Sequence, residues 1–598
     1  MRSSFPLWLA LAPLSLGCAD LLGINDVIRD PGLGGGGGGG SNDGGGGSGG
    51  SNDGGGGSGG SNDGGGGRGG SDEGRPPTTP VPRLPIQDAA VGSMRVPDTR
   101  RPTFVWEPSE STAEGSIEYT IELSEDPSFA ALLATETTTA TRWQPAADLE
   151  GSTAPPVGSR VYWRVRACAG DACSAPSDVR RINVGRGHSD LDGDAFDDIL
   201  VGATGYAVPG YIPCGAAYVF RGGAGDGFDA ASDGLLLGVN LSGTPIEAAG
   251  FGSTAATADV NGDGFADALV AATAFGDNKG FVRVVFGSST DPGTWPPAQD
   301  LSGSLPGDDR RFGEALASGD INGDGYADVV VGAPGQGPPI TSDPGSAYVF
   351  PGGPDGLDRD ASVMFTGVQS SSAFGTSVAS ADFNGDGFSD VAVGAPGSQR
   401  VHVYFGSAGA FDTVPDGLLV GEGELGLSLD AGDVNGDGFA DLLVGEPVSS
   451  MAFLFLGGPG AEFDATADLE LHGEGPSDRF GQTVSSGGDL DGDGFAEMLV
   501  GAPEVTASGK VYVFRGGESL DAEPDAAMTP RRGGAVETEI SRAGDFNRDG
   551  LGDVVVAFGD GRREVLVFLG GNLADSSQAA LEGAGATSDE RFGSAVSP

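Results

Sequence analysis

Hydrophobic and polar positions follow a strand-like pattern in two long regions of the chain. Between residues 84 and 186, apolar and polar residues alternate through segments 103–106, 119–123 and 161–167. Alternation with a period of two residues is typical of strands with one buried face. From residue 187 to residue 598, short apolar runs recur between acidic and glycine-rich turns. The pattern therefore predicts an all-β protein with two folded regions, 84–186 and 187–598.

One acidic loop of nine residues recurs seven times in region 187–598. Its starting residues are separated by 69, 61, 62, 51, 56 and 56 residues. A period of about 60 residues with four short strands is typical of a β-propeller blade, so the repeat predicts seven blades. We number the loops 1 to 7 by their first residues, which are Asp190, Asp259, Asp320, Asp382, Asp433, Asp489 and Asp545.

Side-chain oxygens occupy positions 1, 3, 5 and 9 of every loop. If the chain curls around one point, these hard ligands suit Ca²⁺, which takes six to eight oxygens, better than the small octahedral Mg²⁺. Without a cation, carboxylates at this density repel one another strongly. Calcium could stiffen the loops or bridge to a ligand, and both interpretations stay open. The predicted ligands of up to seven Ca²⁺ ions are Asp190, Asp192, Asp194, Asp198, Asp259, Asn261, Asp263, Asp267, Asp320, Asn322, Asp324, Asp328, Asp382, Asn384, Asp386, Asp390, Asp433, Asn435, Asp437, Asp441, Asp489, Asp491, Asp493, Glu497, Asp545, Asn547, Asp549 and Asp553.

An EF-hand loop begins in the same way but requires a bidentate Glu at position 12. Here position 12 is valine in every copy, and the following residues read as a strand rather than a helix. The sequence therefore excludes an EF-hand. The seven valines are Val201, Val270, Val331, Val393, Val444, Val500 and Val556.

Two further elements recur around the loops. A Phe-Gly pair precedes four of them, as in Phe251-Gly252, and Leu425-Gly426 is a variant; Gly-Ala-Pro follows three of them, as in Gly332–Pro334. With these elements, the repeat resembles the FG-GAP repeat of integrin alpha chains over about 410 residues. The resemblance implies a seven-bladed propeller with calcium loops on one face and partner binding on the other. The connection 204–215 belongs to that second face, where Tyr206 and Tyr211 are candidates for ligand contact or for packing.

The ends of region 187–598 predict how the ring closes. Loop 1 has no Phe-Gly pair before it, whereas residues 591–598 form a Phe-Gly strand with no loop after it. We therefore expect the C-terminal strand to complete the blade that carries Asp190, which leaves no open sheet edge at that point.

Region 84–186 has the length and strand spacing of a seven-strand sandwich. It resembles a fibronectin type III domain, because Trp106 stands where a core Trp belongs and Tyr162 opens the strand YWRVRA. A recognition module and a stalk spacer are both open as roles. Cys168 and Cys173 stand between two predicted strands and could form a disulfide across a hairpin, as an oxidising compartment permits.

The first 83 residues are predicted to form a targeting signal followed by a tether. Residues 1–17 combine Arg2 with a short apolar run, as in a secretory signal peptide. Residues 15–18 resemble a bacterial lipobox, and this resemblance implies a lipid on Cys18. Ala19 after the cysteine then favours the outer membrane as the destination. The alternative is a secreted protein without a lipid. Residues 18–83 contain the repeated unit SNDGGGGSGG and are predicted to be a disordered tether, because they cannot bury apolar surface.

Composition restricts the function further. Asp and Glu number 85 against 32 Lys and Arg, which gives a formal net charge of −53 and disfavours nucleic acid as a partner. The three histidines stand in no recognisable triad or zinc motif. We expect a monomeric cell-surface lipoprotein of a bacterial envelope, membrane-bound through Cys18 alone, that binds a protein or glycan in adhesion. The alternatives are a structural envelope or matrix protein without a dedicated ligand and, third, an extracellular hydrolase.

Overall fold

A computed structural model describes residues 75–598 of the chain, apart from 114, 187–188, 209, 225–230, 240–244, 247–248, 291, 293–294, 296, 304–310, 336–343, 410, 506–508, 530–537, 542–543, 559–563, 572–578 and 582–590. The predicted signal peptide, Cys18 and most of the tether lie outside the described residues. Within them, no helix is both long and apolar enough to cross a membrane.

Residues 82–184 form two β-sheets around a shared aromatic core. The indoles of Trp106 and Trp163 are buried, and the ring of Phe104 meets Trp163 edge-on at 5.0 Å between centroids. Cys168 and Cys173 are disulfide-bonded across the β7–β8 hairpin. The fibronectin type III identity stays a prediction. One sheet has the order β1 (Pro82–Leu84), β3 (Phe104–Trp106), β6 (Arg142–Trp143), and the other has the order β2 (Ala89–Val91), β9 (Arg180–Val184), β7 (Ser159–Ala169), β4 (Ile117–Ser124), β5 (Ala134–Thr138), with β8 (Ala172–Cys173) paired to β7.

The prediction of an all-β fold is confirmed, and the described part of region 187–598 contains seven four-stranded antiparallel sheets, which we call blades 1 to 7. Only two short helices interrupt the described strands, α2 (Phe275–Asn278) and η3 (Pro396–Ser398). The blades are β37 (Phe592–Ser597), β10 (Ile199–Ala203), β11 (Ala216–Phe220), β12 (Gly234–Leu237); β13 (Phe251–Ala258), β14 (Asp267–Ala272), β15 (Val282–Val285), β16 (Pro297–Leu301); β17 (Leu316–Gly319), β18 (Asp328–Ala333), β19 (Ser346–Phe350), β20 (Val363–Thr366); β21 (Val378–Ala381), β22 (Asp390–Ala395), β23 (Arg400–Tyr404), β24 (Gly417–Val420); β25 (Leu429–Gly432), β26 (Asp441–Glu446), β27 (Met451–Phe455), β28 (Leu469–His472); β29 (Val484–Ser486), β30 (Met498–Ala502), β31 (Lys510–Phe514), β32 (Ala526–Met528); and β33 (Thr538–Ile540), β34 (Val554–Phe558), β35 (Glu564–Phe568), β36 (Ala579–Leu581).

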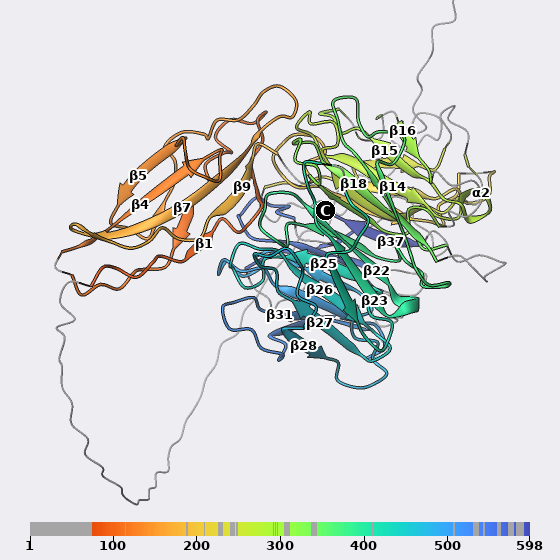
Figure 1. Ribbon diagram of the computed structural model, residues 1–598. Helices are drawn as coiled ribbons and strands as arrows, with labels where there is room; N and C mark the ends of the chain where they lie inside the picture. Colours follow the sequence, from red (N-terminus) through yellow and green to blue (C-terminus); the bar gives the residue numbers. More distant parts are fainter. Residues whose placement is uncertain are drawn as a thin grey trace, which may run out of the picture. The chain divides into compact units, whose positions relative to one another are not determined.

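Blade 1 combines both ends of this region. Strand β37 pairs with β10, with Leu200 opposite Ser597 and Val201 opposite Val596. In Figure 1 this C-terminal strand, in blue, lies among the green strands of blades that come much earlier in the chain. The C-terminal strand therefore supplies the first strand of blade 1, because the chain before β10 forms the two-sheet domain.

A circle of backbone hydrogen bonds joins each loop to the one before it. The N–H at position 8 of a loop donates to the carbonyl at position 1 of the preceding loop, for example Ala266 to Asp190 at 2.8 Å. The circle closes where Asp197 of loop 1 donates to the carbonyl of Asp545 of loop 7 at 3.4 Å. The other five donor–acceptor pairs are Ala327–Asp259, Ser389–Asp320, Ala440–Asp382, Ala496–Asp433 and Gly552–Asp489.

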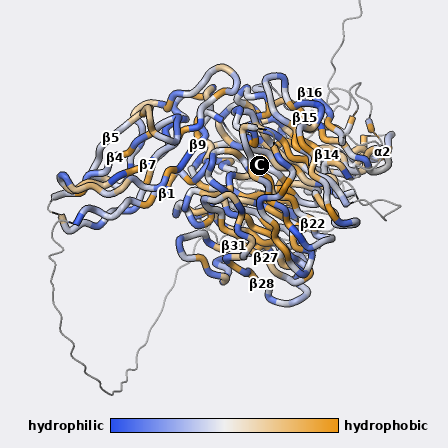
Figure 2. The backbone as a smooth tube through the Cα atoms, viewed as in Figure 1, coloured by the Kyte–Doolittle hydropathy of each residue, from blue (hydrophilic) through white to orange (hydrophobic). Residues whose placement is uncertain are grey.

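The second strand of each blade is buried along its whole length. Strands β10, β14, β18, β22, β26, β30 and β34 carry only buried residues, because both faces of a blade pack against neighbouring blades. Figure 2 shows hydrophobic residues concentrated in these inner strands. The seven valines at position 12 lie here and are fully buried, which supports the exclusion of an EF-hand.

The Phe-Gly element joins successive blades at the end opposite the loops. Phe251 and Gly215 form a backbone bridge between blades 2 and 1, and Phe251 is fully buried. Gly252 has φ +86°, and a Cβ there would lie 2.2 Å from the carbonyl oxygen of Ala216. Only glycine tolerates both constraints, so the second residue of the element is fixed by contact with the neighbouring blade.

We predict that replacing Phe592 with Ala destabilises the molecule by about 3–5 kcal/mol. Phe592 lies in β37, is 7% exposed, and packs edge-on against Tyr218 at 5.3 Å between ring centroids. Urea unfolding and thermal melting measure the effect. The control, Val368→Ala, removes methyl groups from a side chain that is 86% exposed and should change the free energy of unfolding by less than about 0.5 kcal/mol. Equal stability of F592A and wild type would contradict closure by this strand.

Candidate metal centres on the acidic loops

Loops 2 to 7 connect the first and second strands of their blades, whereas loop 1 connects strand β9 of the two-sheet domain to β10. Each loop curls around its own side chains. In loop 2, Asp259 accepts the N–H groups of Asp263 and Gly264 at 3.0 and 2.9 Å. Asn261 accepts the N–H of Asp263 at 2.8 Å, and Asp263 accepts that of Phe265 at 3.0 Å. Side chains at positions 1, 3 and 5 therefore turn inward because each caps backbone N–H groups a few residues further on.

The carboxylate at position 9 has a structural task in addition to its predicted ligand role. Asp267 opens strand β14, is fully buried, and accepts the N–H of Val260 at 3.1 Å and that of Gly287 at 3.0 Å. It thereby ties the loop to the turn after the third strand. The same pair of bonds recurs at Asp198, Asp328, Asp390, Asp441 and Asp553. At Asp267 each oxygen accepts one N–H group, so each keeps a second lone pair for a cation.

Loop 6 has the donor set that fits a metal ion best. Asp489, Asp491 and Asp493 bring one oxygen each within 4.8 Å of one another, as do Asp190, Asp192 and Asp194 of loop 1. Glu497 stands at position 9 and is fully buried, and its Oε1 has no hydrogen-bond partner among the described residues. An unpaired buried carboxylate oxygen is costly, and a hard cation held by these oxygens would satisfy it.

Burial and mutual repulsion raise the pKa values of these carboxylates. Burial, reinforced by Asp194 and Asp192, raises the pKa of Asp190 to about 7. Burial likewise raises the pKa of Asp390 to about 8 and that of Glu497 to about 9. The loops can therefore hold a metal, which would favour the charged form of these groups.

Loops 1 and 6 carry Asp instead of Asn at position 3, and each pairs this extra carboxylate with an arginine of its own blade. Arg221 lies 2.9 Å from Asp192, and Arg515 lies 2.9 Å from Asp491. Both arginines stand directly before the glycine that follows the third strand. In the five loops with Asn, that place is held by an apolar residue, namely Phe286, Pro351, Phe405, Leu456 or Leu569. The extra negative charge is thus neutralised inside the blade.

The geometry also explains two backbone positions. Glycines at positions 4 and 6 have positive φ, for example Gly262 at 68° and Gly264 at 86°. A Cβ at Gly193, position 4 of loop 1, would lie 2.6 Å from the ring of Phe265 in loop 2. The aromatic residue at position 7 therefore stacks on the preceding loop, instead of pointing into its own blade.

Arginines of the two-sheet domain contact five of the loops, and sequence analysis missed all of them. Arg95, Arg186, Arg160 and Arg180 donate to backbone carbonyls of Asp263, Gly325, Gly387 and Gly436 at 2.7–2.8 Å. Arg83 lies over the ring of Phe495 at 4.4 Å. The sequence RRINVGR at 180–186 was the one visible signal, because a cluster of Arg is unusual in so acidic a chain.

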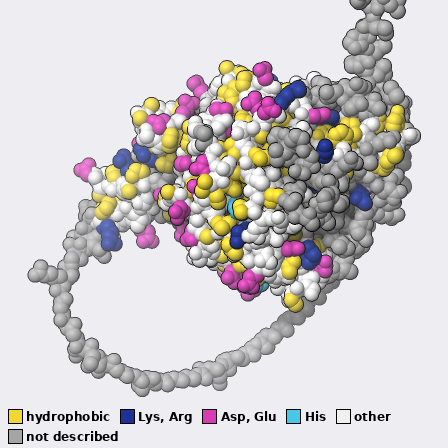
Figure 3. All heavy atoms as spheres, turned by 45° about the vertical axis from the view of Figure 1, so that its right-hand side comes forward, with side chains coloured by type: hydrophobic (Ala, Val, Ile, Leu, Met, Phe, Trp, Pro, Cys, Tyr) yellow, Lys and Arg dark blue, Asp and Glu magenta, His cyan; other side chains and the backbone are white. Residues whose placement is uncertain are grey.

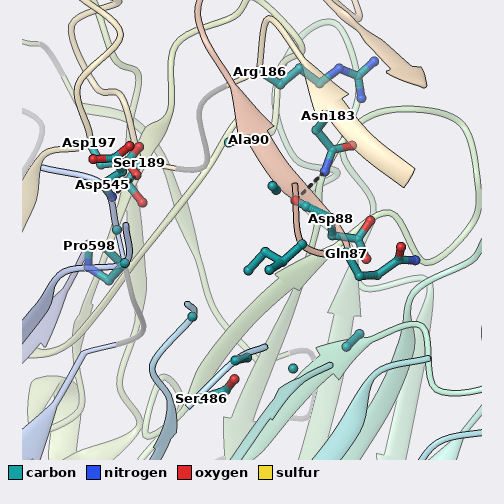
Figure 4. A pocket seen from close by; sticks show the side chains of 18 of the residues that line it. Gln87, Asp88, Ala90, Asn183, Arg186, Ser189, Asp197, Ser486, Asp545 and Pro598 are labelled. Carbon is teal, nitrogen blue, oxygen red and sulfur yellow. Dashed lines mark hydrogen bonds between the residues drawn. The ribbon is translucent and has the colours of Figure 1, made fainter. Parts of the chain in front are cut away.

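A cavity of about 1070 Å³ lies between this domain and the innermost strands of the blades. Gln87, Asp88 and Asn183 lie on one side of it and Asp197 and Asp545 on another (Figure 4). The amide of Asn183 donates to the carbonyl of Asp88 at 3.1 Å. The two-sheet domain therefore covers the loop end of the ring's central channel.

The two candidate ligand tyrosines differ in exposure. Tyr206 is only 8% exposed and packs edge-on against Tyr218, so its surroundings favour packing, one of the two roles left open for it. Its ring is drawn inward because the connection 204–215 folds back, with Cys214 and Gly215 donating to the carbonyl of Tyr206 at 3.0 Å. Tyr211 is 47% exposed.

Known proteins share the repeat. The family described as "FG-GAP repeat" matches residues 251–285, 312–350, 374–410, 425–461 and 480–514, each spanning the first three strands of one blade. Blades 2 to 6 are FG-GAP repeats. Phosphatidylinositol-glycan-specific phospholipase D of Bos taurus is 39% identical over 185 residues, which cover 28% of this chain and 22% of that protein. Integrin alpha-5 of Xenopus laevis is 32% identical over 248 residues, which cover 37% of this chain and 22% of that protein.

The matched part of the chain spans about a fifth of the length of these curated relatives. Among solved structures, the C-terminal WD40 domain of Sif2 aligns with 62% of this chain and 78% of its own, at a TM-score of 0.33 and 14% identity. The repeat assignment therefore rests on the sequence motifs and on the four-stranded blades.

We predict that the metal-free FG-GAP protein loses stability as the pH rises from 5 to 8. Unfolded Asp titrates near pH 3.9, whereas burial raises the pKa of Asp190 and of Asp328 to about 7. The folded state therefore binds more protons between these values, and the free energy of unfolding falls as the pH rises through this window. A pKa that is one unit higher in the folded than in the unfolded state changes the free energy of unfolding by about 1.4 kcal/mol across this pH window. Thermal melting after removal of divalent ions measures the trend, and a melting temperature that rises from pH 5 to pH 8 would contradict it.

We also predict that Ala195→Gly stabilises the protein by roughly 0.5–1 kcal/mol. Ala195 holds position 6 of loop 1 with φ 74°, a conformation that costs free energy for any residue with a Cβ. The matched control is Gly264→Ala at position 6 of loop 2, where φ is +86° and a Cβ would lie 2.9 Å from Val157 Cγ1. Urea unfolding should show a higher free energy of unfolding for Ala195→Gly and a lower one for Gly264→Ala. A change in the same direction in both variants would argue against this account of position 6.

Proposed function

We propose that the protein is a calcium-dependent binding protein of the bacterial cell surface, which uses the propeller face opposite the acidic loops to hold a protein partner in adhesion. FG-GAP repeats occur in the matched integrin alpha chains and favour a binding fold over an enzyme. The predicted lipid on Cys18 would keep the propeller at the envelope.

One observation carries the proposal. Arginines of the two-sheet domain contact loops 2 to 6, which favours the opposite face of the ring as the site of a partner. In an antiparallel blade, connections between the second and third strands lie at the end opposite the loops, as do those between successive blades. Tyr211, Ile212, Phe275, Val368 and Val448 stand in such connections and are 40–86% exposed.

The exposed hydrophobic side chains of the propeller are unevenly distributed. Among its described residues, the large ones lie mostly on this opposite face, whereas Val414 stands on the loop side. Aromatic and aliphatic anchors within a polar surface are typical of protein-binding sites. Asp and Glu outnumber Lys and Arg on the face drawn in Figure 3, which fits a protein partner better than nucleic acid.

Calcium is the cation that the loops suit best. Their ligands are all oxygens, the donor set that Ca²⁺ prefers, and Glu497 Oε1 is a buried oxygen without a partner among the described residues. Residues at positions 1, 3, 5 and 9 would hold the ion. Bound calcium would neutralise adjacent carboxylates and so stiffen the ring of loops that supports the opposite face.

The test is capture from a solubilised envelope fraction on the immobilised protein, with purified envelope polysaccharide as a second probe. We expect saturable capture of a protein that weakens about tenfold or more in Tyr211→Ser and Val368→Asp, because loss of an interface anchor costs roughly 1–2 kcal/mol. Val414→Asp is the matched control and should retain binding. Capture of polysaccharide alone, or equal binding by all variants, would contradict the proposal.

A further inference from the structure

Two acidic loops differ from the others in the partner of their first carboxylate. Arg181 of strand β9 donates through Nη1 to Asp382 Oδ2 of loop 4, and these side chains are 7% and 2% exposed. Arg160 of β7 lies 3.4 Å from Asp320 Oδ2 of loop 3. Among the ion pairs of the described residues, no arginine pairs with the first carboxylate of the other five loops.

The acidic loops differ in how many carboxylates they carry and in which of these pair with arginine. Loops 2 to 5 and loop 7 each carry three carboxylates. Loop 1 carries five and loop 6 carries four, and Arg221 and Arg515 pair with Asp192 and Asp491 of these loops. Apart from Asp192 and Asp491, every loop therefore has at least three carboxylates, and arginines of the two-sheet domain pair with one of these in loop 3 and one in loop 4.

The position of Arg181 is fixed from both sides. Its Nη2 donates to Asp88 Oδ2 at 2.7 Å, and Asp88 precedes strand β2 of the same domain. Asp88 and Asp382 thus face the guanidinium of Arg181 from two sides, and an arginine side chain stays cationic in proteins. Asp382 also accepts the N–H of Gly387 at 2.9 Å, which keeps the loop folded independently of the arginine.

We propose that Arg181 and Arg160 lower the calcium affinity of loops 4 and 3, so that the protein has two classes of calcium site. This inference rests on the proposed calcium binding. Calcium affinity in oxygen sites follows the charge of the ligands, and a guanidinium on the same carboxylate reduces that charge and repels the ion. By thermodynamic reciprocity, calcium in these two loops weakens the contact between the two-sheet domain and the loop face.

The experiment is a calorimetric calcium titration of the purified full-length chain after removal of divalent ions. Wild type should show a tight class of sites and a weaker class, separated by roughly five- to 150-fold in dissociation constant, the usual range of coupling between sites. Arg181→Gln should move one site from the weak to the tight class, and Arg160→Gln should do the same. Arg181→Lys, which keeps the charge, should leave that site weak.

The matched control is Arg95→Gln. Arg95 contacts a loop through the carbonyl of Asp263 and the ring of Phe265, without touching a carboxylate, so this variant should leave both classes unchanged. Thermal melting of each metal-free variant checks that it is folded. A single class of sites in wild type, or no change in R181Q and R160Q, would overturn the inference and leave the calcium proposal standing. Absence of any calcium binding would instead overturn the proposed function.

Discussion

Buried negative charge at the seven acidic loops is the constraint on which the rest of the structure depends. In every loop the carboxylate at position 9 is buried and the one at position 1 is buried or half-buried. Burial raises the pKa of both, as Asp545 and Asp553 show. Such groups are tolerated only when hydrogen bonds or cations compensate them. The protein supplies backbone N–H groups within each loop, arginines within blades 1 and 6, and arginines from the two-sheet domain.

The same carboxylates organise the ring. The position 9 side chain joins its loop to the turn after the third strand, and the position 1 backbone carbonyl accepts an N–H from the next loop. Since the second set of bonds forms a closed circle, a change in one loop reaches both of its neighbours. A cation in one loop would therefore stabilise more than its own blade, and the loop face acts as a connected layer.

The arginine contacts give the two-sheet domain a defined role. Its arginines meet loops 2 to 6 through carbonyl oxygens, an aromatic ring and two carboxylates, which a passive spacer would not require. The domain lies on the loop side of the channel, opposite the face proposed for partner binding.

The sequence by itself determined the features that arise within a few residues. The loops, the strands that follow them and the C-terminal Phe-Gly strand were readable because turn formation and strand burial depend on local residue patterns. The pairing of Asp at position 3 with Arg221 and Arg515 was also present in the sequence, although it becomes interpretable only once the loop and the third strand are known to meet.

Tertiary structure decided what depends on contacts between distant segments. Arg181 reaches Asp382, which lies 201 residues away in the chain, and no local pattern indicates which loop an arginine of another domain will meet. Tyr206 was indistinguishable from Tyr211 in sequence, but the fold of the connection buries one and exposes the other. Glycine at position 4 is required by an aromatic ring of the next loop. In each case the physical reason is the same: packing between elements, rather than residue type, sets the environment of the side chain.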